Sequence, residues 1–78
     1  MKELVQFLAK SLVNHPEAVE VIETQGETAS VLELKVAKED LGRIIGKQGR
    51  TAKSIRTILN AAASRANRKV VLEIIEEK

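Results

Sequence analysis

The chain has 78 residues and a net charge of +2, which is enough for one small domain with a thin core. It contains no cysteine, which excludes a disulfide framework and a thiolate metal site. No apolar run approaches the roughly 20 residues that cross a bilayer, and the first residues lack a signal-peptide layout. Phe7 is the only aromatic residue, which argues against a platform that stacks bases on aromatic rings. We therefore expect a cytoplasmic protein with no membrane segment.

The first half of the chain alternates between helical and extended patterns. Apolar residues at helical spacing predict a helix over residues 2–14, which ends before Pro16 because proline disfavours helix in the residue that precedes it. Alternating apolar and charged residues predict strands over 18–24 and 29–37. The turn residues 25–28 between them indicate an antiparallel hairpin.

The second half is predominantly helical. A short helix is predicted over 38–45, a glycine loop over 46–49 and a longer helix over 50–66, followed by a strand over 70–75 and a polar tail at 76–78. The predicted apolar stripe of the longer helix consists of Ala52, Ile55, Ile58, Leu59 and Ala62. The order αββααβ predicts a two-layer α+β fold, in which three helices cover one face of a three-stranded sheet. Ile22, Val71 and Ile75 would then point to the uncovered face.

The charges are segregated along the sequence. Residues 35–69 carry ten lysines and arginines against two acids, a local charge of +8, whereas the remainder carries −6. A basic region of this kind is typical of a surface that binds a polyanion. A solvated helix face is the alternative, but here the charges surround the glycine loop.

The glycine loop Gly46-Lys47-Gln48-Gly49 is the most informative segment. Glycine adopts positive φ and lets another molecule approach the backbone closely. The helix predicted to follow places its partial positive charge at the loop, an arrangement that suits a phosphate backbone.

Enzymatic alternatives fail on particular residues. Only three residues separate Gly42 from Gly46 where a Walker A loop has four, and Gln48 stands where a serine or threonine should hold Mg²⁺. His15 is the sole histidine, which leaves no metal site and no paired nucleophile. We predict no catalysis, no cofactor and no small-molecule substrate.

The glycine loop, the isoleucine pair Ile44-Ile45 before it, the isoleucines on the next helix and the αββααβ order together resemble a type II KH domain. The resemblance covers essentially residues 1–78, as a single KH domain, and the chain is similar to the bacterial KhpA family. This resemblance implies a non-catalytic single-stranded RNA-binding protein of the cytoplasm. It also implies a dimer, either with itself or with the larger KH protein KhpB (also called Jag or EloR). The implied roles are post-transcriptional regulation and, in some bacteria, cell elongation.

The same resemblance implies which residues contact RNA. Gly46 and Gly49 would clamp the backbone, with Lys47 and Gln48 as the variable pair between them. The remaining predicted contacts are phosphate contacts from Arg43, Arg50 and Lys53 and groove-lining contacts from Ile45 and Ile55.

Some alternatives stay open. The second predicted strand is expected to form the other wall of the groove, at Lys35 and Val36. Core packing is the alternative role of the isoleucines, and solvated surface is the reading we favour for Arg56, Arg65 and Arg68. The competing function is a protein–protein interaction module with a vestigial loop, but a lysine in the loop and the basic belt favour RNA. Single-stranded DNA stays open as a ligand.

Overall fold

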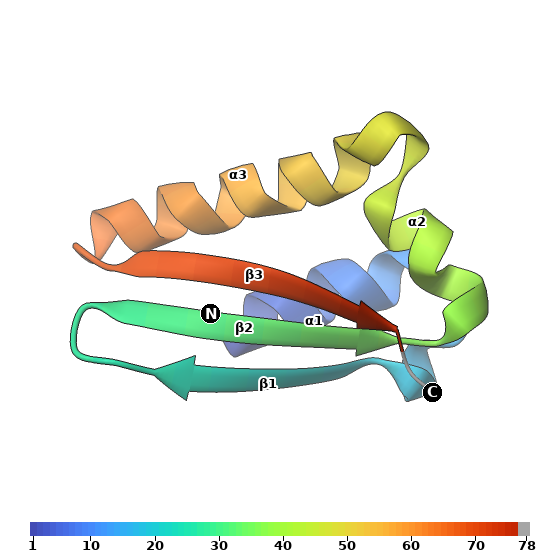
Figure 1. Cartoon of the computed structure of the whole chain (residues 1–78), viewed down its shortest axis with the longest axis horizontal. Helices are drawn as coiled ribbons and strands as arrows, with labels where there is room; N and C mark the ends of the chain where they lie inside the picture. Colours follow the sequence, from blue (N-terminus) through green and yellow to red (C-terminus); the bar gives the residue numbers. More distant parts are fainter. Residues whose placement is uncertain (77–78) are drawn as a thin grey trace.

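The structure, a computed structural model, describes residues 1–76 (Figure 1). Glu77 and Lys78 of the predicted tail lie outside the described residues. The helices and strands follow the predicted order αββααβ and are α1 (Lys2–Leu12), β1 (Glu20–Gln25), β2 (Ala29–Val36), α2 (Leu41–Ile45), α3 (Arg50–Arg65) and β3 (Lys69–Glu76). Short 3₁₀ turns occupy Pro16–Ala18, Lys38–Asp40 and Lys47–Gly49.

The three strands form one mixed sheet in the order β1-β2-β3. β1 and β2 form the predicted antiparallel hairpin, in which Val21 lies opposite Leu34. β2 and β3 are parallel, with Leu32 beside Leu72. A parallel pair needs a crossover connection, and α2, the glycine loop and α3 supply it. In the order β1-β2-β3 the strand β3 lies at an edge of the sheet, and α3 runs beside it (Figure 1).

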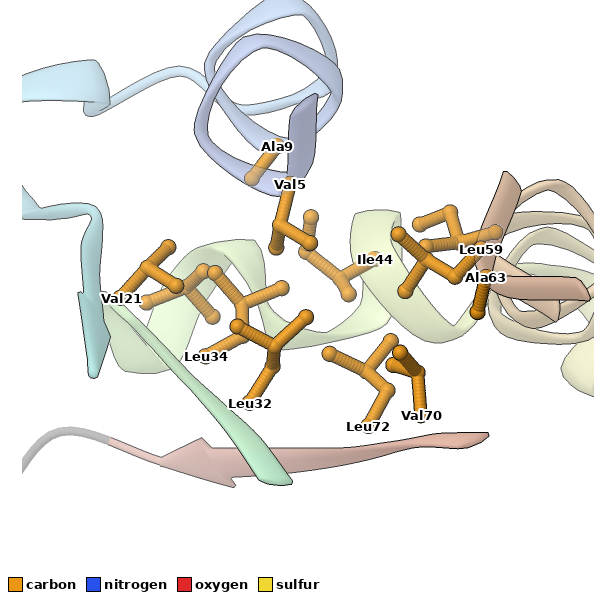
Figure 2. Packing of buried hydrophobic residues seen from close by; sticks show 12 residues of the cluster. Val5, Ala9, Val21, Leu32, Leu34, Ile44, Leu59, Ala63, Val70 and Leu72 are labelled. Atoms are coloured by element: carbon orange, nitrogen blue, oxygen red, sulfur yellow. The ribbon is translucent and has the colours of Figure 1, made fainter. Parts of the chain in front are cut away.

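The core lies between the sheet and the helices (Figure 2). Leu32, Leu34 and Val36 of β2 are 0% exposed, as the alternation of that strand predicts. The helices contribute Val5 and Ala9 from α1, Ile44 from α2, and Ile55, Leu59 and Ala63 from α3. On the opposite face of the sheet Ile22 is 39% and Val71 is 45% exposed, so the prediction that helices cover one face is confirmed.

Two predicted boundaries are wrong near Pro16. α1 ends at Leu12, two residues early, and Val13 is already extended. Pro16 then begins a 3₁₀ turn, a position that suits its fixed φ. The first strand therefore starts at Glu20 rather than at residue 18.

The predicted stripe of α3 is also partly wrong. The helix buries Ala52, Ile55, Leu59 and Ala63, a row in which successive residues are three or four positions apart, whereas Ile58 is 44% exposed. Because α3 lies along the edge of the sheet, it buries only this narrow line.

Arg68 is not a solvated surface residue, contrary to the reading we favoured. Its guanidinium donates hydrogen bonds to the Ser30 hydroxyl at 3.0 Å and to the carbonyls of Gly26 at 3.2 Å and Glu27 at 3.5 Å. Ser30 is itself buried. Arg68 therefore joins the turn after α3 to the turn of the β1–β2 hairpin, a contact between residues some 40 positions apart that local sequence cannot indicate.

Arg68→Met should lower the free energy of unfolding by about 1–2 kcal/mol, because the buried Ser30 hydroxyl and two turn carbonyls lose their donor. Urea unfolding followed by circular dichroism measures the change. The control is Arg65→Met, an exposed arginine at the end of α3, three residues before Arg68, which should change stability by no more than about 0.5 kcal/mol. Equal effects of the two substitutions would contradict the role given to Arg68.

Candidate nucleic-acid interface

The loop between α2 and α3 depends on glycine at two positions for different reasons. Gly46 has φ 76° and ψ 173°, a conformation that is essentially restricted to glycine. A Cβ there would stand 2.6 Å from the Cβ and 2.8 Å from the backbone nitrogen of Thr51. Gly49 is left-handed, with φ 76° and ψ 10°, but within the described chain no atom beyond its neighbours lies within 4 Å of where its Cβ would stand. Gly46 therefore closes the turn, and Gly49 leaves an open surface.

Some backbone amides and carbonyls of the loop are hydrogen-bonded to each other. The Gly49 amide donates to the Gly46 carbonyl at 3.1 Å, and the Arg50 amide donates to the Lys47 carbonyl. Both amides at the start of α3 are thus already bonded inside the 3₁₀ turn. An incoming phosphate would be attracted by the helix dipole and by side chains, rather than by these two amides.

The predicted contact residues fall into three groups. Lys47 and Gln48 of the loop and Arg50 and Lys53 of the first turn of α3 are exposed and lie together on consecutive turns of the chain. Ile45 is 39% exposed beside them. Ile55 is 3% exposed and belongs to the core, so it offers almost no surface to a ligand in this structure.

Arg43 contacts the segment after α1. With the Asn14 amide oriented so that its oxygen faces Arg43, the guanidinium donates to that oxygen from Nε at 3.2 Å and from Nη2 at 3.1 Å. Arg43 therefore joins α2 to the segment after α1, and a phosphate would compete with Asn14 for it.

Asp40 is a residue of this region that sequence reasoning missed. In the structure its side chain is buried and accepts hydrogen bonds from the backbone amides of Asn14 at 3.0 Å and His15 at 2.9 Å. Those partners are 26 and 25 residues away, so no local pattern marks the contact. The carboxylate fixes the start of α2, and hence the loop, to the segment after α1.

Two opposing effects set the pKa of Asp40. Burial raises it, but the hydrogen bonds from the two amides and the nearby charges of His15 and Arg43 outweigh burial. The pKa is therefore lower than its ordinary value of 3.8.

A cleft of about 180 Å³ lies between α3 and the edge strand β3. It is lined by Arg56, Leu59 and Asn60 from α3 and by Val70, Val71 and Leu72 from β3. The second strand, expected to form the other wall of an RNA groove, does not line this cleft, because β2 is the central strand, paired on both sides, and Val36 is 0% exposed. The parallel crossover places β3, not β2, at the edge beside α3.

A polar row connects the loop to this cleft. Gly49, Lys53, Arg56 and Asn60 follow one another at intervals of four, three and four residues, which places them on one face of α3. The open position Gly49 and the cleft therefore lie along the same face of α3.

Other kinds of site find no support in the described part of the chain. Among residues 1–76 no helix is long and apolar enough to cross a membrane. The same residues contain no group of three or more histidine, aspartate or glutamate side chains arranged to hold a metal ion.

A GxxG loop between two helices of an αββααβ fold, beside a cleft on the edge strand, defines a type II KH domain. The chain belongs to the KhpA/KhpB family of KH domains, whose family model matches residues 2–74.

Curated relatives agree over the whole length. The chain is 61% identical over 75 residues to the RNA-binding protein KhpA of Clostridium perfringens, a match that covers 96% of this chain and 100% of the relative. It is 54% identical to the RNA-binding protein KhpA of Chlamydia pneumoniae, with both chains fully covered. These relatives are named for binding and not for an enzymatic activity, in agreement with the prediction of a non-catalytic protein.

A solved structure supports the fold. A crystal structure of Era from Aquifex aeolicus matches with a TM-score of 0.61 and 22% identity, over 96% of this chain but only 29% of the Era chain. At this identity the match supports the fold alone.

Gly46→Ala should lower the free energy of unfolding by about 3 kcal/mol, since it combines a glycine-only conformation with a clash against Thr51. Gly49→Ala should cost only about 1–2 kcal/mol, the price of a left-handed residue in open space. Urea unfolding of both variants checks the order. Equal losses would contradict the distinction between the two glycines.

Asp40→Asn should lower the melting temperature at neutral pH, because an amide cannot accept both hydrogen bonds with the strength of a carboxylate. Because the pKa of Asp40 is lower in the folded state, its ionised carboxylate stabilises the fold at pH values above the unfolded-state pKa. This stabilisation is lost as the pH falls through the folded-state pKa. The difference between parent and variant should therefore be constant from neutral pH to about 5 and shrink below 4. Thermal melts across this range measure it; a difference that does not depend on pH would contradict the ionised contact.

Proposed function

We propose that this chain binds single-stranded RNA without catalysis, by clamping the sugar–phosphate backbone on the loop Gly46–Gly49. The observation that carries the proposal is the open space at Gly49, next to exposed Lys47 and Gln48 and at the start of a 16-residue helix. A strand can approach the backbone closely there, and its bases can then follow α3 toward the cleft beside β3.

The electrostatic part of the mechanism rests on Lys47, Arg50 and Lys53. These side chains are exposed and surround the open surface, whereas Arg43 is occupied by Asn14. With three or four phosphates engaged, the logarithm of the binding constant should fall with the logarithm of salt concentration at a slope of roughly −2 to −3.

The relatives named as RNA-binding proteins support the choice of RNA over other polyanions. In this proposal the protein acts in the cytoplasm as a single KH domain, in post-transcriptional regulation and with an effect on cell elongation. It pairs with a second copy or with a larger KH protein of the KhpB kind. Pairing would join two weak sites and raise their avidity.

Replacing Lys47 and Gln48 together by aspartate should weaken RNA binding by about tenfold or more, because the change removes one positive charge and adds two negative charges at the clamp. Both side chains are exposed, so the melting temperature and self-association should stay unchanged. Fluorescence anisotropy with a labelled single-stranded RNA, at two salt concentrations, measures the loss.

The matched control is Lys2→Asp with Gln25→Asp, which makes the same charge change at exposed positions on α1 and β1. Its RNA affinity should change far less than that of the loop variant. A DNA oligomer of the same sequence tests whether the ribose contributes. Unchanged RNA affinity in the loop variant would instead favour the interaction module.

A further inference from the structure

The sheet has one face that no helix of the described chain covers. In Figure 1 α1 lies behind the sheet, α3 runs beside it, and no helix of residues 1–76 lies in front. We call this uncovered surface the open face. The alternation of the strands places on it Ile22 of β1, Val31 and Glu33 of β2, and Val71, Glu73 and Ile75 of β3. Ile22 is 39% and Val71 45% exposed, so apolar side chains meet solvent here.

Two carboxylates interrupt the open face at its centre. Glu33 and Glu73 are direct partners in the parallel pair β2–β3. Like charges at neighbouring positions of a sheet destabilise it, and in the described part of the chain neither carboxylate forms an ion pair. Lys35, the partner of Glu20, and Lys69 lie near the two ends of this face. The free protein therefore holds an uncompensated negative pair between aliphatic side chains.

This combination of groups decides which occupant fits. The carboxylate pair repels RNA, whose backbone is negative. A second copy packed face to face about a two-fold axis through the centre would set the same carboxylates against each other. Burying carboxylates without a partner is costly. The occupant therefore has to bring a cation to Glu33 and Glu73 and aliphatic groups to the side chains around them.

We propose that the open face docks an amphipathic helix of a partner protein, whose apolar stripe carries one arginine or lysine near its middle. The cation lies over Glu33 and Glu73, and the aliphatic residues of the stripe contact Ile22, opposite Glu33, and the neighbours Val31 and Val71. The eight residues of β2 span about 26 Å, the length of a helix of roughly 17 residues. The glycine loop lies at the junction of α2 and α3, outside the open face, and stays free (Figure 1).

Two synthetic helical peptides of about 18 residues, the length that matches the sheet, serve as probes. Both carry leucines at helical spacing on one face, and the middle of that face is arginine in one peptide and glutamate in the other. The full, isotope-labelled chain is titrated with each peptide and followed by NMR. The arginine peptide should bind at least about tenfold more tightly than the glutamate peptide. Its chemical-shift changes should map to β1, β2 and β3.

Substitutions on the open face separate the charges from the apolar contact. Glu33→Gln with Glu73→Gln should make the two affinities equal without lowering the melting temperature, because a repulsive pair is removed. Glu33→Lys with Glu73→Lys should reverse the preference, so that the glutamate peptide binds more tightly. Ile22→Ser should weaken the binding of both peptides, because it removes apolar surface from the contact.

The matched control is Glu3→Gln with Glu27→Gln, the same chemical change at exposed positions on α1 and in the hairpin turn, which should keep the preference. Equal affinities of the parent for the two peptides, shift changes confined to the glycine loop or α3, or no binding up to about 1 mM peptide would overturn the proposal. Altered self-association of the Glu33→Gln, Glu73→Gln variant with unchanged peptide binding would overturn it as well. These titrations contain no RNA, so their outcome leaves the proposed function untouched.

Discussion

The position of the short helix α2 is the constraint on which the site depends. α2 has only five residues, too few to be stable by itself, and it holds one end of the glycine loop. The Asp40 carboxylate ties its start to the amides after α1, and Ile44, 0% exposed, buries its other side in the core. Because the two anchors lie on either side of one short helix, the orientation of the loop follows from the packing of α1 and the sheet.

The crossover that builds the sheet also builds the cleft. Parallel pairing of β2 with β3 requires the chain to return across the sheet, and α3 makes that return. The helix then lies beside β3, which has no further strand on that side within residues 1–76, so an edge strand and a polar helix face are brought together. The parallel pairing of β2 with β3 therefore also produces the cleft between α3 and β3.

The tertiary structure divides the basic residues into different roles. Lys47, Arg50 and Lys53 are exposed around the loop, whereas Arg68 supports a hairpin turn and Arg43 supports the segment after α1. Arg56 lies between these groups, with one long bond to the backbone of β3. The local charge of +8 therefore overstates the charge available to a polyanion.

The sequence by itself determined the order of elements, the hairpin, the buried face of β2 and the position of the glycine loop. Each of these follows from local rules: the periodicity of apolar residues, turn composition and the conformational freedom of glycine. Only the tertiary structure decided that β2 is central, that the cleft is walled by β3, that Ile55 is core and Ile58 is exposed, and that Asp40 and Arg68 are tethers. These features depend on contacts between residues far apart in the chain, and the partner of a hydrogen bond 25 or 42 residues away leaves no periodic signal in the sequence around either residue.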